Sequence, residues 1–325
     1  MGERPAGGAS RPITGTWIDF YHVNDHEGDL WNDAVARWPD EAWELKVAEM
    51  AAAGLDTLVV GAVAVAGRPF YPSRLMPDRW RPLAAADPVA AVLRSAERHG
   101  LGVYLGVGFF QDDTGALGAT AGEGRLRQDV PRELADRYGA FDSFAGWYLP
   151  VEAGIDGHFP DAFRRYADAM SAACRRAAEL AILIAPYGTR TVEPDARFVQ
   201  QLRDLPVTHI AYQDEVGVQK TRVEELGGIY RRLEMAHREA GRPLWTDVEL
   251  FSFQGEVYRS PLLPAPPERV ARQVAAQSPL VEKVLAYQFL GLLNAPHTPC
   301  PAGHPDGVGL YEALARQRIL APPAR

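Results

Sequence analysis

Short apolar runs alternate with amphipathic stretches along the whole chain. Runs rich in β-branched, aliphatic and aromatic residues predict eight strands, at residues 13–21, 56–65, 102–110, 144–152, 180–188, 208–216, 243–251 and 283–292. Between them, apolar residues recur with a helical period, most clearly at residues 40–54 and 159–179, each with an Asp near its start. The strict alternation of strand and helix predicts a parallel sheet.

Eight strand–helix units in a chain of 325 residues predict a closed (β/α)8 TIM barrel of the α/β class. We expect a flexible N-terminal tail at residues 1–12 and one barrel domain at residues 13–325. An open, doubly wound sheet is the main rival. No Gly-x-Gly-x-x-Gly follows the first strand, so the dinucleotide-binding version of that rival has no support.

The side chains of a strand point alternately to its two faces, so each strand has a helix-facing set and an interior set. We assign the bulkier apolar set of each strand to the helices, as with Ile18 and Phe20. The last strand then turns Leu285 and Tyr287 toward the helices. Polar and aromatic residues assigned to the interior are Trp17, Asp19, Tyr148, Glu152, Gln213, Trp245, Asp247, Glu249 and Gln288.

Composition narrows the range of partners and compartments. The formal net charge is -8 and basic residues gather nowhere, which argues against nucleic acid and against an anionic membrane as partners. No apolar run reaches the roughly 20 residues of a membrane span, and the N-terminus has no apolar signal segment. Two cysteines make no disulfide framework. We therefore expect a soluble, cytoplasmic protein.

Two strands end in the same way. Glu152 closes "GWYLPVE" and Glu249 lies in "LWTDVEL", at the ends of the fourth and seventh predicted strands. Barrel enzymes keep their active sites at that end, and the two carboxylates would face one another across the barrel mouth. Glycoside cleavage uses such a pair, about 5–5.5 Å apart for retention and about 6.5–9.5 Å apart for inversion. Structural ion pairs at the rim are the plainer explanation.

The segments "GTWIDFY", "GWYLPVE", "APYG", "YQDEVGV" and "DVELF" resemble a bacterial family of glycosidase-like TIM barrels of unassigned function, over roughly residues 13–295. That family is related to the clan of retaining glycoside hydrolases, which carries catalytic glutamates on strands 4 and 7. The resemblance implies that Glu152 is the acid/base and Glu249 the nucleophile. Val151 departs from the clan pattern, which has Asn directly before the strand-4 glutamate.

Further residues are candidates for binding a small glycoside or oligosaccharide. Polar candidates for sugar hydroxyls are Asp19, Gln213, Asp214 and Gln288, and aromatic candidates for stacking on a sugar ring are Trp17, Tyr148, Tyr187 and Trp245. Structural ion pairs, satisfied core amides and barrel packing explain the same residues equally simply. The oligomeric state stays open, as do the sugar, the linkage and the stereochemical outcome.

We expect neither a cofactor nor a metal. The loops at residues 22–29 and 297–304 contain His, Asp, Glu and Cys, but neither has a standard zinc spacing, so both are expected to enclose substrate. The Gly-rich loop after the third strand, from residue 109 on, is another candidate lid. Competing functions are a non-hydrolytic barrel enzyme, such as an isomerase or lyase, and an inactive sugar-binding barrel.

Overall fold

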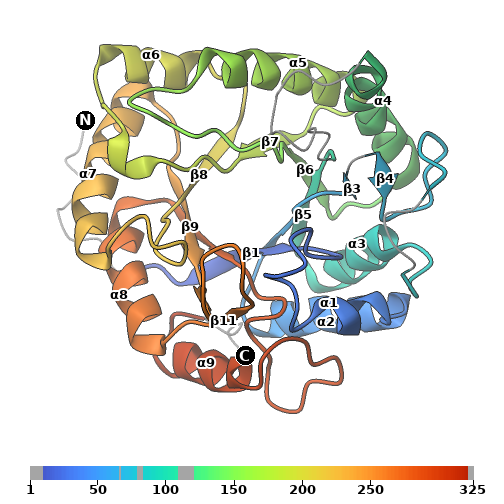
Figure 1. The fold of residues 1–325 in the computed structure, drawn as a ribbon. Helices are drawn as coiled ribbons and strands as arrows, with labels where there is room; N and C mark the ends of the chain where they lie inside the picture. Colours follow the sequence, from blue (N-terminus) through green and yellow to red (C-terminus); the bar gives the residue numbers. More distant parts are fainter. Residues whose placement is uncertain (1–9, 66, 79–82, 109–120, 321–325) are drawn as a thin grey trace.

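The barrel is closed in the computed structural model, which describes residues 10–65, 67–78, 83–108 and 121–320. Eight parallel strands are hydrogen-bonded in the order β1-β12-β9-β8-β7-β6-β5-β2, and Figure 1 looks into the barrel they form. Their bounds are β1 Ile13–Ile18, β2 Thr57–Val60, β5 Gly102–Gly106, β6 Phe144–Tyr148, β7 Ala181–Ile184, β8 His209–Gln213, β9 Trp245–Glu249 and β12 Lys283–Tyr287. The predicted (β/α)8 barrel is confirmed.

The strands begin within two residues of the predicted positions and stop earlier than predicted. β1 ends at Ile18 and β6 at Tyr148, so the apolar stretches that follow them leave the sheet and build the barrel mouth. Asp19 therefore stands just beyond its strand and Glu152 four residues beyond, whereas Glu249 is the last residue of β9.

Helices surround the barrel. Within the described ranges they are α1 Asn32–Ala36, α2 Asp40–Ala52, α3 Pro88–His99, α4 Ala121–Tyr138, α5 Asp161–Ala177, α6 Ala196–Asp204, α7 Val223–Ala240, α8 Pro267–Gln277 and α9 Asp306–Arg316, with short 3-10 turns at Thr189–Thr191 and Ser278–Leu280. Residues 109–120, where a lid was expected, lie outside the described residues. None of the described helices is both long enough and apolar enough to cross a membrane.

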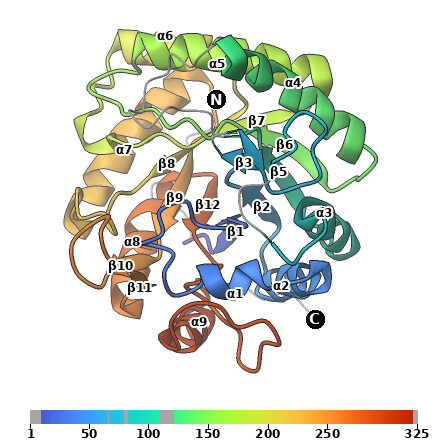
Figure 2. The same ribbon diagram turned by 45° about the vertical axis from the view of Figure 1, so that its right-hand side comes forward.

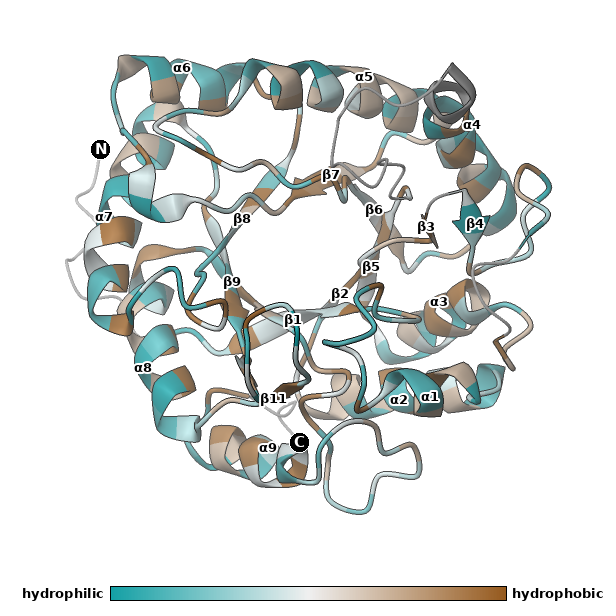
Figure 3. Cartoon of the chain, in the orientation of Figure 1, coloured by the Kyte–Doolittle hydropathy of each residue, from teal (hydrophilic) through white to brown (hydrophobic). Residues whose placement is uncertain are grey.

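Helix α5 shows why these segments pack as they do. Phe163, Ala167, Met170 and Cys174 recur at helical spacing, and all four are buried against the barrel. Each large apolar side chain buried in this way stabilises the fold by about 1.5–3 kcal/mol. Figure 3 shows the same division, with apolar strands inside and helices whose surfaces alternate between apolar and polar.

Two short hairpins rise from the carboxyl ends of the barrel strands. One pairs β3 Ala64–Val65 with β4 Arg68–Pro69, and the other pairs β10 Phe251–Phe253 with β11 Leu262–Pro264. Figure 2 labels β3, β10 and β11, and Figure 1 labels β4. The second hairpin is tied to the loop after β1, because the Leu262 N–H donates to the carbonyl of Glu27 at 3.1 Å.

Apolar and aromatic side chains fill the interior of the barrel below the carboxyl ends of its strands. The inner cluster consists of Trp17, Val59, Tyr104, Tyr148, Leu183, Ala185, Ala211, Trp245 and Leu285. The inward direction predicted for Trp17, Tyr148 and Trp245 is therefore correct.

The faces predicted for β12 are wrong. Leu285 belongs to the inner cluster and Tyr287 packs against it, while Ala286 packs on the helix side. Hydrophobicity did not distinguish the two faces, because both sets are apolar. The neighbouring strand decides: a side chain at Gly15 on β1 would collide with Leu285, so this glycine makes room for Leu285 inside the barrel.

Candidate functional site

A cavity of about 610 Å³ opens at the carboxyl ends of the barrel strands. Both Glu152 and Glu249 line it, from the segment after β6 and from the end of β9. The other predicted site residues in its lining are Trp17, Asp19, Tyr148, Tyr187 and Gln213. Seven of the ten predicted side chains thus come together in one cavity of a size usual for small-ligand sites.

Glu152 has the environment of a carboxylic acid that keeps its proton near neutral pH. Glu152 lines the cavity and is exposed to the solvent inside it. The surrounding protein still desolvates its carboxyl group and raises its pKa to about 7, and the negative charges of Asp19 and Glu215 add to the rise. A hydrogen bond from Gln213 and the charge of Lys220 oppose it.

Glu249 is almost fully buried and held on several sides. Its Oε2 accepts a hydrogen bond from the N–H of Val218 at 2.9 Å. Its backbone carbonyl accepts from Arg269 Nη2 at 3.0 Å and from Gln273 Nε2 at 3.2 Å. Burial, followed by the negative charge of Asp214, raises its pKa well above the ordinary value, while the backbone N–H of Val218 favours the ionised form.

Asp247 is a third carboxyl group in the cavity. It stands two residues before Glu249 on β9, so both side chains point to the same side of the strand. The residue is 3% exposed, and its Oδ1 has no hydrogen-bond partner among the described residues. Burial and then the charge of Glu249 raise its pKa well above the ordinary value. The alternation along β9 predicts that Asp247 points into the barrel, although Asp247 is not among the predicted site residues.

Asp19 lies beside the loop that follows β1. Its Oδ2 accepts a hydrogen bond from the Tyr287 hydroxyl at 2.8 Å, and burial raises its pKa above the ordinary value. A side chain at Gly61 would collide with Asp19, so the glycine provides the space that this carboxyl group occupies. Next to it, His22 Nε2 lies 3.5 Å from Glu27 Oε2, and both residues line the cavity.

Lys220 stands at the rim, on the loop after β8. Its ammonium group lies 5.0 Å from the ring centre of Tyr187 and 5.9 Å from that of Tyr258, both within cation–π range. Lys220 is exposed, and its charge favours the ionised form of Glu152. Lys220 lies in a loop, where no strand or helix period indicates which way a side chain points, so the sequence does not predict its place near the cavity.

Three predicted residues lie outside the cavity lining. Asp214 is fully buried behind Glu249 and accepts hydrogen bonds from Gln273 Nε2 at 2.7 Å and Gln277 Nε2 at 2.9 Å. Trp245, the first residue of β9, stacks on His209 at 4.0 Å between ring centres, four residues below Glu249. Neither of these two side chains is part of the cavity lining.

Gln288 is the third predicted residue outside the cavity lining. It was expected to face the barrel interior, but Leu285 and Tyr287 are the residues of β12 that face inward, so Tyr287 lines the cavity instead. Gln288 is fully buried, and its side-chain oxygen and nitrogen have no hydrogen-bond partner among the described residues.

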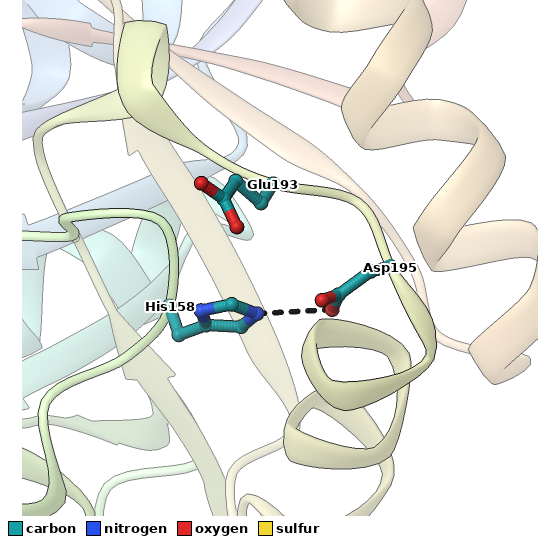
Figure 4. Close-up of side chains that lie close together, drawn as sticks. All are labelled: His158, Glu193 and Asp195. Atoms are coloured by element: carbon teal, nitrogen blue, oxygen red, sulfur yellow. Dashed lines mark hydrogen bonds and ion pairs between the residues drawn. The ribbon is translucent and has the colours of Figure 1, made fainter.

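A separate group of polar side chains lies on the loops after β6 and β7. Ligand-type atoms of His158, Glu193 and Asp195 lie within 4.8 Å of one another, and Figure 4 shows the three side chains converging. Asp195 also caps helix α6 by accepting from the Phe198 N–H at 2.9 Å, and it pairs with His158 at 2.9 Å. These contacts, the Phe198 N–H first, lower the pKa of Asp195.

The barrel is similar to solved structures of glycoside hydrolases. A Bacteroides thetaiotaomicron VPI-5482 protein, provisionally assigned as an alpha-L-fucosidase, matches with a TM-score of 0.71 and 19% identity, over 99% of this chain and 98% of that one. The endo-beta-1,4-mannanase of Thermotoga petrophila matches with a TM-score of 0.58 and 9% identity, over 98% and 78%. An endocellulase from Pyrococcus horikoshii gives 0.54 and 12%, over 95% and 93%. At these identities the likeness shows the fold.

Sequence comparison gives a family without an assigned activity. A family model described as "Domain of unknown function (DUF4434)" matches residues 13–299. No curated protein matches the chain in sequence. The predicted resemblance to glycosidase-like barrels of unassigned function is confirmed.

Proposed function

The chain belongs to the DUF4434 family, and on that premise we propose that it is a glycoside hydrolase that uses Glu152 and Glu249 as its two catalytic carboxyl groups. The observation that carries the proposal is that both side chains line one cavity at the carboxyl end of the barrel. Active sites of barrel enzymes lie at this end, and glycoside cleavage needs two carboxyl groups there. The substrate class is a small glycoside or an oligosaccharide.

Glu152 suits the role of general acid. With a pKa of about 7, it holds a proton for a substantial fraction of the time at neutral pH and can donate it to the leaving oxygen. After the leaving group departs, the same carboxylate can accept a proton from water. Gln213, which donates a hydrogen bond to Glu152, orients the carboxyl group.

Glu249 suits the role of nucleophile by its position and its fixed geometry. Backbone contacts and the Val218 N–H hold its carboxyl group in one orientation, which reduces the reorganisation needed for attack. Its raised pKa means that it must lose a proton before it reacts. The relation to the retaining clan favours attack by Glu249 at the anomeric carbon and a covalent intermediate, and the first product anomer seen by NMR tests this.

At Val151 this chain lacks the Asn that the retaining clan has directly before its strand-4 glutamate. Val151 is buried, and it lines the cavity with an apolar side chain where the clan has an amide. Val151 therefore cannot donate a hydrogen bond to the sugar 2-hydroxyl, and the half-buried Gln213 offers a side-chain amide in the same lining.

A panel of aryl glycosides tests the proposal. Glu249→Gln removes the nucleophile without changing its size, and we expect kcat to fall by about 10⁴-fold or more on any glycoside that the wild type cleaves. Glu224→Gln is the matched control, because Glu224 is exposed on α7 and pairs with Arg272 away from the cavity. Full turnover by Glu249→Gln would overturn the proposal.

A further inference from the structure

The lining of the cavity is strongly unbalanced in charge. Its acidic side chains are Asp19, Glu27, Glu152, Asp247 and Glu249, whereas His22 is the basic side chain among the described lining residues. His22 already faces Glu27 at 3.5 Å. Arg269, which lies behind Glu249, donates to the backbone oxygens of Glu249 and Phe251 and does not line the cavity.

Glycoside cleavage uses two of these carboxyl groups and leaves Asp247 unexplained. Asp247 is buried, yet its Oδ1 has no partner among the described residues. A buried oxygen without a hydrogen bond costs about 1–3 kcal/mol, so such atoms usually meet a ligand or an ordered water. Its side chain lines the same cavity as the two proposed catalytic glutamates.

The aromatic part of the lining favours the same kind of ligand. Aromatic side chains in the wall are Trp17, Phe20, Tyr21, Phe70, Tyr148, Tyr187, Phe251 and Tyr287. The faces of aromatic rings carry negative potential and attract ammonium groups, with the largest effect where water is excluded. The ammonium group of Lys220 already lies 5.0 Å from the centre of the Tyr187 ring. The carboxyl groups and the other ring faces make a wall that favours a cation over an anion.

We propose that the substrate bound in this cavity is an amino sugar with a free, positively charged amine, and that Asp247 is the residue that binds the amine. This inference rests on the proposed function, since it names the substrate class of the same site. A uronic acid or a phosphorylated sugar would place an anion among carboxylates, and an N-acetylated sugar would leave Asp247 without a cationic partner.

Calorimetric titration with matched sugars tests the inference. Glucosamine, galactosamine and mannosamine are each compared with their N-acetyl forms, at a pH where the free amine is protonated. We expect at least one free amine to bind roughly tenfold or more tightly than its N-acetyl partner. Equal or weaker binding of all three amines, or no detectable binding of any of them, overturns the inference.

Asp247→Asn identifies the binding residue. The variant keeps the size of the side chain and removes its charge, so the preference for the free amine over the N-acetyl form is expected to disappear. Glu224→Gln removes one negative charge from the outer surface and should keep the preference. A preference that survives in Asp247→Asn contradicts the role of Asp247.

The outcomes separate this inference from the proposed function. Cleavage of aryl glycosides that depends on Glu249, without a preference for free amines, overturns the inference and leaves the hydrolase proposal in place. A preference for free amines without cleavage of any glycoside overturns the hydrolase proposal and leaves an amino-sugar-binding barrel.

Discussion

Two groups of carboxyl side chains in this molecule have opposite electrostatics. In the cavity, Glu152, Asp247 and Glu249 have raised pKa values, because the surrounding protein desolvates them and other negative charges lie nearby. On the loops after β6 and β7, Asp195 has a lowered pKa, because it accepts hydrogen bonds from Phe198 and His158 (Figure 4).

The difference teaches which group can perform acid chemistry. A carboxyl group that is ionised throughout the neutral range cannot donate a proton there, whereas one with a pKa near 7 can. The exposed group has its contacts satisfied by a helix cap and an ion pair. The cavity group includes an oxygen with no partner among the described residues. Desolvation and neighbouring negative charges raise the pKa values of the cavity carboxyl groups, whereas hydrogen bonds lower the pKa of Asp195.

The largest effect expected from this comparison is on catalysis. Glu152→Gln should lower kcat by about 10²–10⁴-fold on substrates whose leaving group needs a proton, and by less on glycosides with strongly acidic leaving groups. In the wild type, kcat/KM should fall as the pH rises through about 7, because the acid loses its proton. A pH–rate profile checks both points. An unchanged alkaline limb in the variant would assign that limb to another group.

The next largest effect is expected at Asp214, which is buried behind Glu249 and accepts a hydrogen bond from its backbone N–H. Asp214→Ala leaves the amides of Gln273 and Gln277 without their shared acceptor and should lower the free energy of unfolding by about 1–3 kcal/mol. Because the Glu249 N–H also donates to Asp214 at 3.3 Å, kcat should fall as well. Thermal unfolding and initial rates measure the two effects. Asp214→Asn, which keeps one acceptor oxygen, should be milder in both.

The pH dependence of the Tm should distinguish the carboxyl groups of the cavity from Asp195. Asp247 has a folded-state pKa above its ordinary value of 3.8, so the folded protein binds the proton more tightly and loses stability as the pH rises through that raised value. The Tm of the wild type should therefore be higher at pH 5 than at pH 8. Asp247→Asn should shrink this difference by about 2–4 °C. An identical difference in wild type and variant would show that Asp247 is not protonated at pH 5.

The smallest effect is expected at the exposed group. Asp195→Ala removes the cap of α6 and the contact with His158, so the Tm should fall by less than in Asp214→Ala while kcat/KM stays at the wild-type value. Asp195 has a lowered folded-state pKa, so its contribution to stability is present above the ordinary value of 3.8 and is lost as the pH falls. A large loss of activity in this variant would place the group in the reaction.

The sequence predicted the strands, the barrel and the inward side of most strands, because apolar alternation has a clear period. It failed where two faces were equally apolar, as on β12, where the packing of Leu285 against Gly15 of another strand decides. The alternation of apolar and polar residues also does not show how far a residue lies from the carboxyl end of its strand. Trp245 and Glu249 share a face, but four residues at about 3.3 Å each separate them by about 13 Å.

Contacts between distant segments explain the remaining differences. Asp214 was expected to bind substrate, but two glutamines of α8, far along the chain, hold it behind Glu249. Lys220 reaches the site because its loop folds over Tyr187. Neither arrangement leaves a periodic signal in the sequence. Asp247 did leave one, since it has the same parity as Glu249, and a search for further carboxyl groups on that face would have found it.

The packed interior of the barrel has a consequence for turnover. Trp17, Tyr148 and Ala185 belong both to the inner cluster and to the cavity lining, so they close the lower end of the cavity. Under the proposed function, substrate would enter and both products would leave on the side of the carboxyl ends of the strands. The fragment that leaves last would then compete with incoming substrate, and its release is a candidate for the rate-limiting step.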